Sequence, residues 1–192
     1  MPVRNTLAAV LTAGLIAAGA ANAAGLPFDG GRIENPEPLP GFALRDQSDH
    51  SVSLAAQRGK LVLLTFLYTH CKDVCPLTAQ NLSAAVQLLG KQRKAVRVLA
   101  VSVDPRGDTP AAVRHFVRVH RLVPQFHYLT GTEAQLTPIW HRYSVTSVRR
   151  AKGDIDHTLY TVLADRTGKA RVLYDATATP QTVAHDLRLL LD

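Results

Sequence analysis

"LVLLTFLYTHCKDVCP", residues 61–76, joins a long apolar run to the only two cysteines of the chain. The run 61–68 is continuous and of strand length, which predicts a β-strand buried on both faces. Pro76 favours the first turn of a helix, and apolar residues at helical spacing follow it. We therefore expect Cys71 and Cys75 on a strand-to-helix connection.

Strand-like and helical segments alternate along the rest of the chain. The further strands expected from apolar runs and turn residues are 95–104, 125–131, 157–165 and 170–175. The further helices are expected to begin at the capping residues Thr109, Thr132 and Thr179. Together these segments give the order β-α-β-α-β-α-β-β-α.

This order predicts an α/β fold with a mixed, mainly parallel sheet, helices on both faces and a late antiparallel hairpin at an edge. Alternating apolar residues around a polar turn add an N-terminal hairpin over 42–54. Thioredoxin-like domains keep reactive thiols at the end of a core strand, just before its helix. We therefore predict one thioredoxin-like domain over 42–192.

The first 23 residues have the layout of a secretory signal peptide. Arg4 precedes an apolar run over 6–21, and a small-x-small cleavage site follows at 21–23. A membrane anchor would need about 20 strongly apolar residues, whereas Gly and Thr dilute this run. We expect a cleaved, periplasmic protein whose proline-rich residues 24–41 form an extended, weakly ordered lead-in.

The formal net charge of +7 on 192 residues bounds the partners. No dense stripe of Lys and Arg with interleaved aromatic residues is present, so nucleic-acid binding is not expected. A positive excess of this size can attract acidic partners or an anionic membrane surface. A chain of this length needs no disulfide framework to fold, which leaves the cysteines free for chemistry.

The two cysteines could form a disulfide, hold a metal ion or attack a substrate. On a continuous helix, side chains at i and i+4 have Cβ atoms about 5–6 Å apart, whereas a disulfide needs about 3.8 Å. If the pair oxidises, the segment must therefore be a turn. Backbone N–H groups at the helix entrance favour a thiolate there, and His70 and Lys72 can add positive charge beside Cys71.

A third ligand would complete a metal site, because soft sulfur selects copper or zinc and imidazole suits both. Four of the eight histidines fall on predicted helices, and His50 lies in a turn. His127 has no partner that the sequence identifies, and His70 abuts Cys71. His157 follows the loop 144–155. In a thioredoxin-like sheet this loop would pass beside the cysteines. The position of His157 at the entrance to a predicted core strand does not by itself decide the matter.

Four stretches resemble the Sco (SenC-type) family, which are thioredoxin-like copper-binding assembly factors for cytochrome c oxidase. They are "FLYTHCKDVCP" (66–76), "VSVDPRGDTP" (101–110), "YLTGT" (128–132) and "DHTLYTVLAD" (156–165). The likeness covers about residues 36–192. It implies that Cys71, Cys75 and His157 are copper ligands, although Lys72 stands where the family usually has proline.

The resemblance implies a metallochaperone that delivers copper to the binuclear copper site of cytochrome c oxidase. Its partners would be a copper-accepting oxidase subunit, a copper donor protein and a thiol reductant protein. We expect Asp156 to orient His157 or to support it electrostatically. The alternative is a thiol–disulfide oxidoreductase whose catalytic Cys71 and Cys75 reduce another metalloprotein without copper and without His157.

Two other site types fit the sequence poorly. A thiol peroxidase of this fold needs a threonine three residues before its reactive cysteine, but Tyr68 and Lys72 stand there. A structural zinc site would want a fourth protein ligand, and none is evident.

Overall fold

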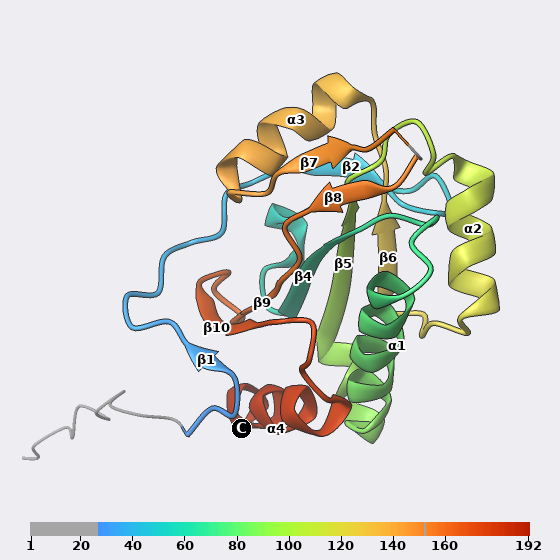
Figure 1. Ribbon diagram of the computed structural model, residues 1–192. Coiled ribbons are helices and arrows are strands. Elements are labelled where there is room, and N and C mark those ends of the chain that lie inside the picture. The colour runs from blue at the N-terminus through green and yellow to red at the C-terminus, as the bar shows by residue number, and fades with distance from the viewer. Residues whose placement is uncertain (1–26, 152) are drawn as a thin grey trace, which may run out of the picture.

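The computed structural model describes residues 27–151 and 153–192 (Figure 1). The signal peptide predicted over 1–23 and the first residues of the lead-in lie outside these ranges. Within them, no helix has both the length and the apolar character that a membrane crossing requires.

Six strands form the central sheet, in the order β1-β10-β9-β4-β5-β6. They are β1 (Gly31–Arg32), β4 (Leu61–Leu67), β5 (Val96–Ser102), β6 (Phe126–Leu129), β9 (Thr161–Ala164) and β10 (Ala170–Tyr174). β4, β5 and β6 are parallel, whereas β9 pairs antiparallel with β4 and β10. The predicted mixed sheet is confirmed, but the late hairpin lies inside the sheet because β1 covers its outer strand.

Four helices connect or follow these strands. They are α1 (Val74–Gln87), α2 (Pro110–Val119), α3 (Glu133–Arg142) and α4 (Pro180–Leu191), with short 3-10 helices η1 (Ala55–Gln57) and η2 (Gly90–Ala95). The side chains of Thr109, Thr132 and Thr179 each accept a backbone N–H at the start of a helix. These are the three caps that the sequence predicts, and they satisfy donors that a helix start leaves free.

Helices cover the sheet from two sides (Figure 1). α1 and α4 lie together in the lower part of the figure and α3 lies at the top. The strands β4, β5 and β6 run between these two groups of helices. All seven residues of β4 are buried, and Phe66 packs its ring 5.5 Å from that of Tyr143 at the end of α3. α2 lies beside β6, where Phe116 contacts Tyr128. The buried central strand is thus the one that carries the cysteines at its end.

Two small hairpins accompany the sheet. β2 (Ala43–Arg45) and β3 (Ser51–Ser53) form the predicted N-terminal hairpin. β7 (Ser147–Arg149) and β8 (Ile155–His157) form a second one, where the sequence indicated only a loop. The expectation that His157 begins a core strand is therefore wrong: it ends β8, and β9 begins only at Thr161.

Part of the lead-in is ordered along the sheet edge. β1 pairs with β10, and Ile33 N–H donates to the carbonyl of Arg171 over 2.9 Å. Leu39 N–H donates to the carbonyl of Gly168 over 2.9 Å. These residues therefore pair through their backbone with β10 and with the turn before it, whereas their prolines suggested only an extended, weakly ordered segment.

Candidate metal centre

The cysteine loop links the last residue of β4 to the start of α1. Cys71 N–H donates to the carbonyl of Tyr68 over 3.4 Å, which closes a turn. Cys75 N–H in turn faces the Sγ of Cys71 over 3.4 Å. Both thiols are free; Cys71 is half-buried and Cys75 fully buried. Because α1 begins only at Val74, Cys71 lies in a turn, as a pair able to form a disulfide requires.

The β7–β8 hairpin brings His157 to the cysteines. Its Nε2 lies 3.7 Å from the Sγ of Cys75. Its Nδ1 lies 3.0 Å from the carbonyl of Thr158, which can only accept, so Nδ1–H donates. Burial lowers the pKa of His157 and favours the neutral ring. In that tautomer the Nε2 lone pair faces the sulfur of Cys75 at hydrogen-bond distance, and it becomes available to a metal ion once Cys75 loses its proton.

Tyr68 contacts both sides of this arrangement. Its ring meets that of His157 edge-on, with centroids 5.6 Å apart. Burial, followed by the negative charge of Cys71, raises the pKa of Tyr68 to about 12. Its hydroxyl therefore stays protonated and serves as a hydrogen-bond donor beside the sulfur of Cys71.

The three predicted ligands lie near one another, but their ligand atoms are not close enough together to bind one ion. Within the described residues, the ligand atoms of Cys71, Cys75 and His157 do not all lie within 4.8 Å of one another. Two sulfur ligands of one ion at about 2.3 Å each can be at most about 4.6 Å apart. Since the Cys75–His157 contact is already short, closing the site requires a movement of Cys71, which the turn outside α1 permits.

The two thiols have opposite acidities. The thiol of Cys75 donates to Cys71, and this bond, opposed by burial and helped by backbone N–H groups, lowers the pKa of Cys71 to about 5. The same hydrogen bond, together with burial, raises the pKa of Cys75. The expectation of a thiolate on this connection therefore holds for Cys71 alone. Hydrogen bonds, and not the charges of His70 and Lys72, lower the pKa of Cys71.

We predict that alkylation of Cys71 in the reduced protein stays nearly constant from about pH 8 down to about pH 6, because the thiolate is the nucleophile. The rate should fall only as the pH drops through about 5, where Cys71 becomes protonated. Iodoacetamide labelling followed by peptide mass spectrometry measures it. Cys75→Ala removes the donor and should move the midpoint toward an ordinary thiol; an unchanged midpoint would contradict this cause.

A buried carboxylate holds the cysteine loop. Asp108 accepts the backbone N–H of Thr69 over 2.8 Å and its hydroxyl over 2.7 Å. It also accepts the hydroxyls of Ser102 over 2.6 Å and Tyr128 over 3.1 Å. Burial raises the pKa of Asp108 despite these bonds. The sequence indicates Asp108 only as part of a turn before a helix, so its supporting role was missed.

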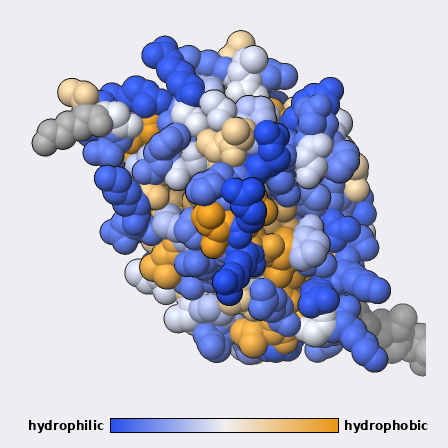
Figure 2. Space-filling model, turned by 90° about the vertical axis from the view of Figure 1, so that its right-hand side faces the viewer, coloured by the Kyte–Doolittle hydropathy of each residue, from blue (hydrophilic) through white to orange (hydrophobic). Residues whose placement is uncertain are grey.

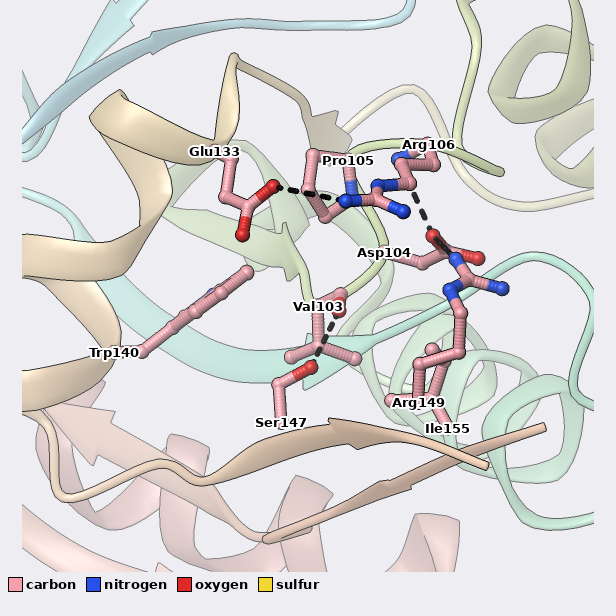
Figure 3. A pocket seen from close by; sticks show the side chains of 9 residues that line it. All are labelled: Val103, Asp104, Pro105, Arg106, Glu133, Trp140, Ser147, Arg149 and Ile155. Atoms are coloured by element: carbon pink, nitrogen blue, oxygen red, sulfur yellow. Dashed lines mark hydrogen bonds and ion pairs between the residues drawn. The ribbon is translucent and has the colours of Figure 1, made fainter. Parts of the chain in front are cut away.

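The hairpin that carries His157 is fastened to the loop after β5 (Figure 3). Arg149 forms an ion pair with the buried Asp104, and Ser147 Oγ donates to the carbonyl of Val103 over 2.8 Å. These groups line a cavity of about 180 Å³ that also includes Ile155 of β8. These contacts hold the hairpin against the loop after β5 and so position His157 beside the cysteines.

Asp156 does not make the orienting contact that the sequence suggested. Its side chain is exposed and forms an ion pair with Arg150 of the same hairpin. The carbonyl of Thr158 holds the Nδ1 of His157 instead. The prediction that Asp156 orients His157 is therefore wrong, whereas the alternative of electrostatic support holds, because the negative charge of Asp156 acts to raise the pKa of His157.

Other histidines have separate roles. His127 pairs with Asp46, with Nδ1 and Oδ2 3.0 Å apart, which supplies the partner that the sequence did not identify. Within the described residues, one cluster of three has ligand atoms within 4.8 Å: Asp29, His185 and Asp186. Asp186 there accepts the backbone N–H groups of Asp29 and Gly30. This cluster therefore ties the N-terminal segment to α4.

Comparison with known proteins places these features in a wider group. A family model described as SCO1/SenC matches residues 32–192. The chain is 34% identical over 134 residues to protein SenC of Rhodobacter capsulatus, covering 68% of this chain and 60% of that protein.

Two solved structures are also similar. The structure of Bradyrhizobium japonicum ScoI with copper bound shows 32% identity and a TM-score of 0.71, covering 80% of this chain and 99% of that one. The apo Sco1 protein of Thermus thermophilus shows 31% identity and a TM-score of 0.72, covering 84% and 95%. The range matched by the family model contains all three candidate ligands.

Proposed function

The chain belongs to the SCO1/SenC family, and from this premise we propose that it is a copper-binding assembly factor for cytochrome c oxidase. In this proposal Cys71, Cys75 and His157 hold copper, and the protein delivers it to the binuclear copper site. The observation that carries the proposal is the 3.7 Å contact between Cys75 Sγ and His157 Nε2, residues 82 positions apart.

The donor set suits copper. Two sulfurs and one imidazole match the ligand preferences of Cu(I), and imidazole also suits Cu(II). His157 offers the lone pair of Nε2, and Cys71 is a thiolate at neutral pH. Cys75 must lose its proton on binding, so uptake of the ion releases a proton. The copper-bound ScoI of Bradyrhizobium japonicum, a relative at 32% identity, supports the choice of metal.

The proposal includes partners and a location. The acceptor is a copper-accepting oxidase subunit, and a separate copper donor protein fills the site. A thiol reductant protein is needed, because only the reduced dithiol offers two sulfur ligands and the space outside the cytoplasm is oxidising. We place the protein in the periplasm, following the export expected from residues 1–23.

Copper titration of the reduced protein tests the proposal. We expect one copper ion per chain and, when the ion added is Cu(II), visible absorption as the thiolates bind. Oxidising the Cys71–Cys75 pair to a disulfide should remove this binding, because both sulfur ligands are lost. Tight binding that persists in the oxidised protein would place the copper elsewhere and end the proposal.

The asymmetry of the thiols favours one second function, reduction of a target disulfide. The exposed part of Cys71, with its low pKa, would attack one sulfur of the target and form a mixed disulfide, releasing the target's other thiolate. Cys75, once deprotonated, would then attack the Sγ of Cys71 and release the second target thiolate. The target gains two electrons, this chain becomes the disulfide, and a thiol reductant protein must restore it.

A further inference from the structure

One end of the molecule carries positive charge without acidic residues in its own segments. The sequence has seven Lys and Arg and no Asp or Glu within the ranges 74–103 and 109–132. No ion pair of the described chain includes any of the seven. In the isolated protein these seven side chains are therefore hydrated and are neutralised by dissolved salt ions.

The topology gathers most of these cations at one edge of the sheet. η2 leads directly into β5, and the segment after α2 leads into β6. Because β4, β5 and β6 are parallel, both segments lie at the edge where strands begin, while the cysteine loop lies where β4 ends. Val123 N–H donates to Ser83 Oγ over 2.9 Å, which holds the end of α2 beside α1.

Two exposed aliphatic side chains accompany the cations. Leu88, just before η2, is 48% exposed, and Val119, at the end of α2, is 49% exposed. In Figure 2, which shows the side on which α2 lies in Figure 1, small apolar patches are separated by hydrophilic residues. We call the following residues the basic end: Leu88, Lys91, Arg93, Lys94, Arg118, Val119 and Arg121.

The acidic groups of the turn between β2 and β3, which approaches from the side of β6, are already engaged. The turn between β2 and β3 reaches β6, where Gln47 donates to the carbonyl of Phe126 over 3.0 Å. That turn carries Asp46, which pairs with His127, and Asp49, which pairs with Arg45. These two carboxylates therefore contribute little negative charge beside the basic end.

We propose that the basic end binds the surface of an anionic lipid bilayer. Lys and Arg interspersed with exposed aliphatic residues provide the two contributions that hold proteins at such surfaces: attraction to anionic headgroups and burial of apolar tips. Protein-binding hot spots instead centre on aromatic residues or Arg in a packed pocket, and Phe116 of α2 is buried. Lipid contact at this edge would turn the cysteine loop away from the bilayer.

Vesicle co-sedimentation of the full chain tests this. We expect binding to vesicles of phosphatidylcholine with phosphatidylglycerol, and loss of that binding as salt is raised, since salt screens exposed charges. Vesicles of phosphatidylcholine alone measure whatever the N-terminal apolar run contributes. Equal binding to both vesicle types would overturn the proposal. So would a protein that binds soluble polyglutamate but not anionic vesicles, because its partner would then be an acidic protein.

A matched pair of triple variants locates the contact. Lys91→Gln, Arg93→Gln and Lys94→Gln together should weaken binding about fivefold per cation, or on the order of a hundredfold in all. Lys72→Gln, Arg106→Gln and Arg142→Gln remove the same charge at the opposite edge and should change binding little. Equal weakening by both sets would mean that net charge alone acts, which overturns the proposal.

Two further measurements separate this inference from the others. Leu88→Ser with Val119→Ser should weaken binding to anionic vesicles without changing its salt dependence; unchanged binding would contradict a role for the apolar tips. Thermal unfolding confirms that each variant is folded. Copper titration of the Lys91, Arg93 and Lys94 variant should match the unmodified chain, so a failure of copper binding and a failure of lipid binding are distinguishable.

Discussion

His157→Ala is expected to weaken copper binding by on the order of a hundredfold or more. Loss of groups that only orient a metal ligand already costs about 10- to 100-fold, and this change removes a ligand itself. Cys75→Ser should abolish binding, because it removes the sulfur that lies closest to the imidazole. Copper titration of the reduced variants in competition with a chelator measures both effects.

The same two variants separate the proposed functions. Reduction of a target disulfide needs Cys71 and Cys75 only, so it should survive in His157→Ala and disappear in Cys75→Ser. If oxidase maturation falls together with copper binding in His157→Ala, the protein delivers copper. If maturation is retained in His157→Ala, thiol reduction is supported. His141→Ala is the matched control, since this exposed histidine of α3 lies outside the site. Tight copper binding in His157→Ala would exclude His157 as a ligand.

Local patterns predicted most of the elements. The continuous apolar run 61–68 indicated β4, because a strand buried on both faces has no polar alternation. Thr109, Thr132 and Thr179 indicated three helix starts, because a capping side chain acts within three residues. In each case the determining contacts are close in sequence.

Contacts between distant segments could not be predicted in this way. The β7–β8 hairpin is held by Arg149 and Ser147 against residues after β5, a contact that no local apolar period reveals. The opposite acidities of Cys71 and Cys75 arise from which sulfur is buried and which donates, and sequence spacing treats both alike. The carbonyl of Thr158 rather than Asp156 orients His157, because the hairpin turns the carboxylate toward Arg150.

Asp108 is the clearest such residue, and replacing it should have the largest effect on stability. Its two oxygens accept four hydrogen bonds, from Thr69 twice and from Ser102 and Tyr128 once each. Each buried donor left without an acceptor costs about 1–3 kcal/mol. We expect Asp108→Ala to lower the free energy of unfolding by about 3–5 kcal/mol, measured by urea denaturation.

Asp108→Asn keeps one acceptor oxygen and the shape of the side chain, so its loss of stability should be smaller. Asp175→Ala is the matched control. Asp175 likewise accepts both the backbone N–H and the hydroxyl of one threonine, Thr177, but in an exposed turn. Its removal should change stability far less, because water replaces the lost acceptor there. Equal losses in the two alanine variants would show that burial of the Asp108 network contributes nothing.

A second readout distinguishes support of the site from support of the fold alone. Thr69 lies two residues before Cys71, and its backbone N–H is held by Asp108. Releasing that bond should loosen the turn that places the Cys71 sulfur within reach of the Cys75 thiol. In Asp108→Ala, at a temperature where the variant is still folded, we therefore expect the midpoint of Cys71 alkylation to rise above about 5, toward an ordinary thiol. An unchanged midpoint, together with lower stability, would limit Asp108 to holding β4, β5 and β6 together.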